Sequence, residues 1–239
     1  NNIEVIFLSK KLIDDYSQDN LKNSECHILP NIIKPLLNKE LAIQKTMEYH
    51  SETKIKNSKA SILYFGHLME SKGYKRALDI AKSILGRREN YNFLFVGEFN
   101  SSIDKEYFDD YVSSNDIKSN VEYLGPCTKD VDKINLLISS DILILPSYSE
   151  AYPLTILEAF SLGLPVVATD TGAIREIVGG DYGKIVSDDP VNENYIKSFS
   201  EAIIKQENKW NQNLAIKCIV NFHEKWSEKE FSKQLLKIF

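Results

Sequence analysis

Two glutamates, Glu150 and Glu158, stand eight residues apart on either side of Pro153. Ionised carboxylates accept hydrogen bonds, so paired glutamates suit a ligand that presents several hydroxyl groups. Proline is typical of the first turn of a helix, because its missing N–H is not needed there. The free N–H groups at such a helix start bind phosphate. The pattern therefore predicts a site for a ligand that combines phosphate and hydroxyl groups, as a sugar nucleotide does.

The segments around these glutamates place them at the edge of a sheet. An apolar strand is predicted at residues 142–145, directly before the loop that carries Glu150. A second apolar run, 166–168, ends in the polar loop 169–172 ahead of a short helix. Ligands of parallel α/β sheets bind at the carboxyl ends of the strands. A lone glutamate pair with this spacing is common by accident, but two adjacent strand ends favour an active-site edge.

This part of the chain also carries a longer motif. A strand is followed by Pro-Ser, a glutamate, seven residues, a second glutamate with Ala, then Gly-x-Pro-Val-Val-Ala and a Gly-containing loop before a third Glu. The motif residues are Pro146, Ser147, Glu150, Glu158, Ala159, Gly163, Pro165, Val166, Val167, Ala168, Gly172 and Glu176. In this register the chain resembles the retaining glycosyltransferases of family four, which have two facing Rossmann-like domains, the GT-B fold. The resemblance is to their C-terminal, donor-binding domain.

A second segment supports the same resemblance. The apolar run 62–65 ends at Gly66 and is followed by His67, Lys72 and Gly73. The family has Gly-Arg here and Lys-Gly a few residues on, and the Arg and Lys grip the donor diphosphate. Lys72 matches, whereas His67 replaces the Arg. Because His is mostly neutral near pH 7 and Arg is always charged, the change predicts weaker diphosphate binding or an altered donor pose. A surface lysine and a loop histidine without ligand contact are the alternatives.

The resemblance implies roles for these residues. Glu150 and Lys72 are the expected catalytic residues, with Glu150 facing the sugar hydroxyls and Lys72 stabilising the leaving diphosphate. Glu158 is expected to accept hydrogen bonds from the ribose. Pro126 and Cys127 stand where the family lines its nucleobase pocket, although a plain connecting loop explains them equally well. The residues expected to bind the donor are Gly66, His67, Lys72, Gly97, Pro126, Cys127, Ala151, Tyr152, Pro153, Leu154, Thr155 and Glu158.

Apolar strands separated by helical patterns define the expected fold. They are predicted at 62–65, 93–96, 121–124, 142–145, 166–168 and 184–186. Strands that alternate with helices form a doubly wound parallel sheet. We therefore expect an α/β protein with a Rossmann-like, doubly wound, six-stranded parallel sheet, the C-terminal half of a GT-B fold, and closing C-terminal helices. Trp210, Phe222, Trp226 and Phe231 are expected to anchor those helices rather than to stack on a ligand.

Four segments are expected along the chain. Residues 1–33 resemble the last strand and the hinge of the family's N-terminal domain, and residues 34–60 form a polar, lysine-rich linker with helical content. Residues 61–222 form the nucleotide-sugar donor-binding domain, and residues 223–239 a helix that packs back toward the N-terminal domain. The missing initiating Met and the single sheet indicate a fragment. We expect such a fragment to be inactive or weakly active.

Composition excludes several other functions. The chain has 34 acidic and 29 basic side chains, which argues against nucleic acid as a partner. Cys26, Cys127 and Cys218 show no paired spacing, so neither a disulfide framework nor a zinc site is expected. No segment is typical of a signal peptide or a membrane span. We expect a cytoplasmic protein, and peripheral contact with the inner face of the membrane stays open.

The expected function follows from the resemblance. It is transfer of a hexose from a nucleoside diphosphate sugar, UDP-linked, to an acceptor hydroxyl with retention of configuration, in polysaccharide or glycolipid biosynthesis. No cofactor and no metal are expected, since helix N-termini and lysine carry the diphosphate charge. The acceptor is a carbohydrate or lipid-linked molecule bound through the missing N-terminal domain. A non-catalytic nucleotide-binding domain and a GT-B sugar-nucleotide epimerase are the alternatives, and the Glu150 and Glu158 arrangement disfavours the epimerase.

Overall fold

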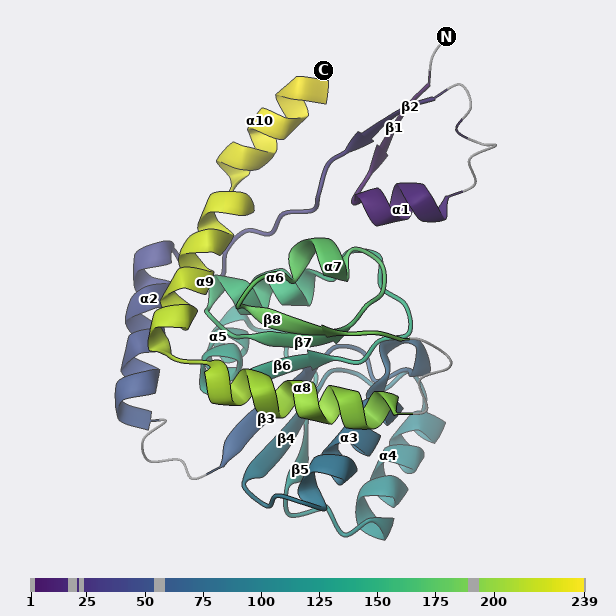
Figure 1. Cartoon of the computed structure of the whole chain (residues 1–239). Coiled ribbons are helices and arrows are strands. Elements are labelled where there is room, and N and C mark those ends of the chain that lie inside the picture. Colours follow the sequence, from purple (N-terminus) through teal and green to yellow (C-terminus); the bar gives the residue numbers. More distant parts are fainter. Residues whose placement is uncertain (1–2, 17–20, 22–23, 54–58, 189–193, 239) are drawn as a thin grey trace.

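A computed structural model of the chain describes residues 3–16, 21, 24–53, 59–188 and 194–238. Parts of the predicted N-terminal segment, linker and C-terminal helix (1–2, 17–20, 22–23, 54–58 and 239) lie outside the described residues, as do 189–193. The central sheet has six parallel strands (Figure 1). They are β3 (Ala60–Phe65), β4 (Tyr91–Val96), β5 (Val121–Gly125), β6 (Ile142–Leu145), β7 (Val166–Thr169) and β8 (Gly183–Val186). The predicted α/β class and the six-stranded parallel sheet are confirmed.

The order of the strands reverses in the middle of the sheet. The spatial order is β5-β4-β3-β6-β7-β8, so the chain first moves outward from β3 and then returns to start again at β6. In such a doubly wound sheet the loops after the two central strands diverge and leave a crevice at the carboxyl edge. The carboxyl ends of β3 and β6 are therefore the expected place for a ligand.

Helices cover both faces of the sheet, which explains why its central strands are apolar throughout. Ile62 and Tyr64 pack toward α3 (Tyr74–Leu85), α4 (Ser102–Ser114) and α8 (Tyr195–Lys209). Leu63, between them, packs on the opposite face, which α5 (Asp130–Ser139), α6 (Leu154–Ser161) and α9 (Gln212–Lys225) cover. This alternation is the period-two pattern of a strand that is buried on both sides. The sheet is thereby a rigid base for the loops at its edge.

Helix α2 (Lys39–Glu48) lies within the predicted linker. It runs along α9 and buries Ala42 and Thr46 (Figure 1). The Thr46 hydroxyl donates a hydrogen bond of 3.1 Å to the carbonyl oxygen of Leu162. A π-helical turn, η2 (Tyr49–Thr53), follows the helix. Part of the predicted linker is therefore packed against the domain.

The strands β1 (Ile3–Phe7) and β2 (Ser24–Ile28) and the helix α10 (Glu228–Ile238) extend from the same side of the domain (Figure 1). β1 and β2 form a separate parallel pair, with α1 (Lys10–Asp15) between them in sequence. At the other end, α9 continues through residues 222 and 223, so the boundary predicted there falls inside a helix. The helix that leaves the body is α10, and none of its described residues is buried. Of the four predicted anchors, Trp210, Phe222 and Trp226 are buried, whereas Phe231 on α10 is not.

Candidate functional site

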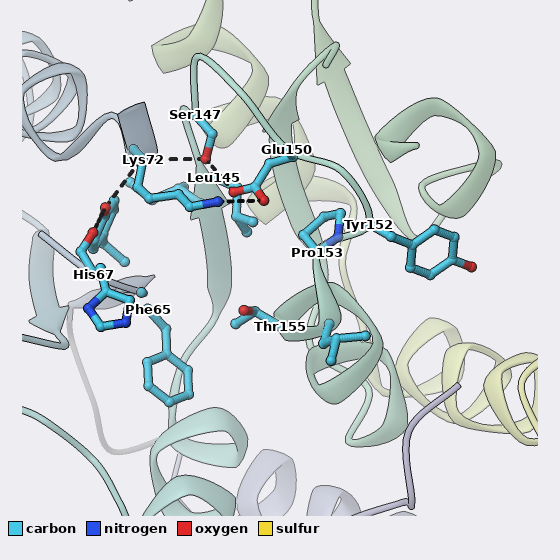
Figure 2. Close-up of a pocket in the computed structure, with 13 residues that line it drawn as sticks. Phe65, His67, Lys72, Leu145, Ser147, Glu150, Tyr152, Pro153 and Thr155 are labelled. Atoms are coloured by element: carbon cyan, nitrogen blue, oxygen red, sulfur yellow. Dashed lines mark hydrogen bonds and ion pairs between the residues drawn. The ribbon is translucent and has the colours of Figure 1, made fainter. Parts of the chain in front are cut away.

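A cavity of about 260 Å³ opens at the carboxyl edge of the sheet, between the loops that follow β3 and β6 (Figure 2). It lies where the strand order reverses, which is where doubly wound sheets bind ligands. The lining residues come from the two strand ends, their loops and the start of α6. They are Tyr64, Phe65, Gly66, His67, Lys72, Ile144, Leu145, Ser147, Glu150, Tyr152, Pro153, Leu154 and Thr155.

Lys72 and Glu150 point toward each other in this cavity (Figure 2). The Lys72 Nζ lies 2.8 Å from Oε2 of Glu150, and the two side chains are 34% and 9% exposed. The Ser147 hydroxyl donates to the other carboxylate oxygen over 2.9 Å. Each oxygen of Glu150 therefore has a donor, as expected for a nearly buried carboxylate. The ion pair that joins the two predicted catalytic residues comes from segments 78 positions apart.

A close backbone contact brings Lys72 to Glu150. Lys72 is the last residue of a short 3-10 turn, η3 (Glu70–Lys72), which ends at Gly73 with a φ of +74°. A Cβ at Gly73 would lie 2.0 Å from the carbonyl oxygen of Pro146. Only glycine permits both this left-handed angle and this approach. The Lys-Gly pair therefore docks the β3 loop on the start of the β6 loop.

A second glycine supports the loop from the other side. Gly172, in the loop after β7, has a φ of +54°, and a Cβ there would lie 1.7 Å from the carbonyl oxygen of Glu150. The next residue, Ala173, donates its N–H to the carbonyl oxygen of Ala151 over 3.0 Å. The Glu150 loop is thus held between the β3 loop and the β7 loop. This contact gives the Gly-containing part of the sequence motif a structural reason.

The start of α6 forms another wall of the cavity. The helix begins at Leu154, as predicted, and both Leu154 and Thr155 line the cavity. Pro153 is its N-cap, and among the described residues no side chain caps the helix and no acid lies in its first turn. The N–H group of Ile156 donates to the carbonyl oxygen of Pro153 over 3.2 Å, so the N–H groups of Leu154 and Thr155 and the positive end of the helix dipole are the groups that can bind an anion.

Glu158 lies one turn further along α6, beside the cavity rather than in its lining. Its Oε1 lies 2.8 Å from Nζ of Lys133 on α5, and the side chains are 19% and 20% exposed. The Lys133 Nζ is also 5.8 Å from the centre of the Phe65 ring, which lines the cavity. Each predicted glutamate is therefore paired with a lysine. Lys133 was missed from the sequence, because a helical pattern alone does not reveal which lysine faces the site.

Cys127 lies close to this second pair. Burial and the nearby Asp132 raise the pKa of its thiol, Lys133 lowers it and Glu158 raises it further. Neither Cys127 nor Pro126 lines the cavity. Both follow β5, and Cys127 is close enough to Glu158 for that carboxylate to affect its pKa.

Two further predicted residues act through their backbone instead of lining the cavity. Gly97, at the end of β4, has a φ of +144°, and a Cβ there would lie 1.9 Å from the carbonyl oxygen of Gly66. It supports Gly66, which does line the cavity. Ala151 is exposed and accepts the N–H of Ala173 described above.

Tyr152 lines the cavity, but its ring turns away from Glu150 (Figure 2). Its side chain belongs to the packing of the C-terminal helices, because its hydroxyl accepts a hydrogen bond of 3.1 Å from the indole N–H of Trp226. Only 8% of the residue is exposed. The sequence placed Tyr152 at the site, but it did not reveal the direction of the ring.

His67 lies at the side of the cavity with Phe65, opposite Tyr152 (Figure 2). Its side chain is exposed, while its carbonyl oxygen accepts a hydrogen bond of 2.8 Å from the Tyr64 hydroxyl. The same hydroxyl lies 3.2 Å from the carbonyl oxygen of Lys72. Burial, and then the nearby Glu150, raises the pKa of Tyr64 far above its usual value, so this hydroxyl stays a donor.

Ser147 and the apolar floor were not among the predicted site residues. The floor consists of Tyr64, Phe65, Ile144 and Leu145, which end the two central strands. The Pro-Ser pair of the motif was a signal for Ser147, whereas the floor residues carry no signal beyond their place at a strand end. Among the described residues no group of three or more His, Cys, Asp or Glu side chains could hold a metal ion. None of the described helices is both long and apolar enough to cross a membrane.

Comparison with known proteins agrees with this geometry. Residues 45–219 match the sequence model of the family Glycosyl transferases group 1. An uncharacterized glycosyltransferase of Methanocaldococcus jannaschii is 26% identical over 177 residues, which are 73% of this chain and 44% of that protein. The lipopolysaccharide glucosyltransferase WaaG of Escherichia coli K12 is 26% identical over 219 residues, 88% of this chain and 56% of WaaG. The chain therefore spans about half the length of these curated relatives.

The fold is similar to part of a larger protein of known structure. A crystal structure of a Staphylococcus aureus TarM variant, in complex with fondaparinux, alpha-GlcNAc-glycerol and UDP, superposes with a TM-score of 0.72 at 18% sequence identity. The superposition covers 98% of this chain and 43% of the TarM chain. Residues 45–219, which match the family model, contain all of the predicted site residues, from Gly66 to Glu158.

Proposed function

This chain belongs to the Glycosyl transferases group 1 family, and we propose that it is the donor-binding part of a glycosyltransferase that moves a sugar from a nucleoside diphosphate sugar to an acceptor hydroxyl. We extend the proposal to a UDP-linked hexose and to retention of configuration. The observation that carries it is one cavity with Lys72, Glu150 and the uncapped start of α6 around it. A diphosphate matches the positive charge of Lys72 and of the start of α6, and the hydroxyl groups of a sugar match the Glu150 carboxylate.

In this proposal the diphosphate lies at the start of α6. The N–H groups of Leu154 and Thr155 and the ammonium of Lys72 supply positive charge where the leaving diphosphate becomes more negative. Lys72 can reach the ligand because a third of its side chain is exposed. No divalent metal is then required, since fixed donors take over the charge stabilisation that a metal would give.

The two glutamates recognise hydroxyl groups. Glu150 accepts hydrogen bonds from the donor sugar, and Ser147 keeps one of its oxygens in place. Glu158 accepts from the ribose, and Lys133 orients it. Hydrogen bonds to ionised carboxylates are short and strong, so they can fix the orientation of both rings.

The acceptor side of the reaction belongs to the proposal as well. The acceptor is a carbohydrate or lipid-linked molecule held by a further domain, because this chain spans about half of its relatives. A cytoplasmic location, at the inner face of the membrane for a lipid-linked acceptor, goes with it. WaaG, named as a lipopolysaccharide glucosyltransferase, supports a role in surface polysaccharide assembly.

Calorimetric titration with UDP, GDP and ADP in parallel tests the donor site. We expect binding of UDP, and loss of that binding in the double variant Lys72→Ala, Glu158→Ala. The matched control is Lys205→Ala, Glu201→Ala, two exposed residues on α8 that do not line the cavity. Binding of none of the three nucleotides, or equal binding by both double variants, would contradict the proposal.

A non-catalytic nucleotide-binding domain is a second candidate. It is favoured by His67 in place of the family's arginine and by the pairing of Lys72 with Glu150. Donor turnover by the full-length protein, measured with and without an acceptor, separates the candidates. A transferase consumes the donor when an acceptor is present, an epimerase converts it without one, and a binding domain leaves it unchanged.

A further inference from the structure

Glu176 reaches from the domain to the N-terminal segment. It lies on α7 (Ile174–Ile177), and its two carboxylate oxygens accept the backbone N–H groups of Lys10 and Lys11 over 3.2 and 2.9 Å. The buried hydroxyl of Ser9 accepts the next N–H, that of Leu12, over 3.2 Å. The N–H groups of Lys10, Lys11 and Leu12 at the start of α1 therefore have acceptors, and a residue more than 160 positions away provides two of them.

The negative charge of Glu176 also favours this contact with the N-terminus of α1. Helix N-termini are stabilised by negative charge, yet α1 has no acidic residue in its first turn. Glu176 supplies that charge from another element. The contact therefore links the start of α1 to α7 through the Glu176 carboxylate. A neutral side chain would not supply the negative charge.

The other end of α7 supports the donor loop. Gly172 lies against the carbonyl oxygen of Glu150, and Ala173 donates to the carbonyl oxygen of Ala151. Ile174 and Ile177 are buried, so this short helix is fixed in the core. α1 and the Glu150 loop thus contact opposite ends of one buried helical turn.

A second cavity borders this junction. This cavity, of about 310 Å³, lies between Leu8, Glu176, Trp226 and the ring of Tyr152. Tyr152 also lines the donor cavity, so the two cavities share one residue. Residues 3–15 lie outside the segment that matches the family. Glu176 therefore joins the family domain to a part of the chain beyond it.

We propose that Glu176 is a positioning residue that holds the N-terminal segment (residues 3–15) on the donor domain and transmits its position to the Glu150 loop. The significance of that loop rests on the proposed function. The hydrogen bonds themselves do not depend on it. The proposal thus predicts that loss of the Glu176 carboxylate loosens both α1 and the Glu150 loop.

Hydrogen–deuterium exchange of the whole chain tests this proposal. In Glu176→Gln we expect about 10-fold faster exchange of the amides of residues 10–12, since one charge-assisted bond is lost, and about three-fold faster exchange in residues 148–152. Glu176→Asp keeps the charge and should restore part of the protection. Glu201→Gln, an exposed glutamate on α8, is the matched control and should change neither segment.

Three outcomes are decisive. Unchanged exchange at residues 10–12 in Glu176→Gln would overturn the contact, and unchanged exchange at residues 148–152 would overturn its transmission. Equal acceleration in the buried strands β6 and β7 would show general destabilisation and would also overturn it. If the wild-type chain binds no nucleoside diphosphate, the proposed function fails, but the exchange result still decides the role of Glu176.

Discussion

The ammonium group of Lys72 lies 2.8 Å from a carboxylate oxygen of Glu150, so the cation that we assign to the diphosphate is already paired. An incoming diphosphate must compete with Glu150 for this lysine. When the diphosphate binds Lys72, the Glu150 carboxylate loses one partner and can accept hydrogen bonds from the hydroxyl groups of the sugar. The proposed function therefore predicts that diphosphate binding and sugar recognition are linked through one ion pair.

This link predicts opposite effects for the two partners. Glu150→Gln frees Lys72, so UDP affinity should rise about three-fold, while donor turnover by the full-length protein is lost. Lys72→Ala removes a charge-assisted contact of about 1.5–3 kcal/mol, so UDP affinity should fall about 10- to 100-fold. Calorimetry with UDP measures both changes. Equal losses of affinity in the two variants would show that Glu150 does not compete with the diphosphate.

The second pair, Lys133 and Glu158, predicts selectivity for ribose. The wild-type chain should bind UDP about 10-fold more tightly than 2′-deoxy-UDP, since one hydroxyl donor to a carboxylate is missing in the latter. Glu158→Gln should remove most of this preference. Lys133→Met should reduce it, because Glu158 loses the partner that orients it. An unchanged preference in Glu158→Gln would exclude Glu158 from ribose recognition.

The fold could be predicted because the central strands are apolar over their whole length. The strand ends were less well predicted: β3 begins at Ala60 and β8 at Gly183, each one or two residues before the predicted start. Small residues at these starts carry no apolar signal. The strand order was not predictable from periodicity. It depends on the direction in which each helical connection leads to the next strand of the sheet.

The site could be predicted where a loop is fixed by its own residues. Gly73 and Pro153 force the turns that present Lys72 and the start of α6, and both turns are present. Side-chain direction could not be predicted, because it depends on partners far away in the sequence. The ring of Tyr152 turns toward Trp226 for this reason.

Cys127 offers a reporter of the proposed nucleotide site. Because burial and Asp132 raise the pKa of its thiol, less of the reactive thiolate is present at a given pH than for an ordinary cysteine. Maleimide labelling of Cys127 should therefore be slow at pH 7 and should speed up as the pH rises through and above the usual thiol range. Bound UDP should slow it further. The difference between wild type and Cys127→Ser, measured by mass spectrometry, isolates this thiol from Cys26, and the pKa of the fully buried Cys218 is raised still more.

Labelling that is fast at pH 7 and independent of pH would contradict the partly buried position of Cys127. Labelling that UDP does not slow would separate the residues after β5 from the nucleotide. The second result would leave the Lys72 part of the site untouched, since Lys72 and Glu150 follow strands β3 and β6 whereas Lys133 and Glu158 lie on helices α5 and α6.

The contact of Gly73 with Pro146 predicts a loss of both stability and binding. In Gly73→Ala the new Cβ meets the Pro146 carbonyl oxygen at 2.0 Å and the residue keeps a positive φ, so we expect a loss of about 2–4 kcal/mol. UDP affinity should fall as well, because Lys72 directly precedes this turn. The control is Gly179→Ala: a Cβ there meets nothing within 4 Å, so we expect a change within about 0.5 kcal/mol. Urea denaturation and calorimetry measure the two quantities.

The comparison between these two glycines decides how Lys72 reaches the site. If both variants unfold at the same urea concentration, the β3 loop is not docked on Pro146, and Lys72 must be placed by its ion pair with Glu150 alone. If Gly73→Ala is destabilised but binds UDP normally, the turn serves the fold and not the ligand. Only the combined loss, absent in Gly179→Ala, supports a backbone contact that positions the lysine for the diphosphate.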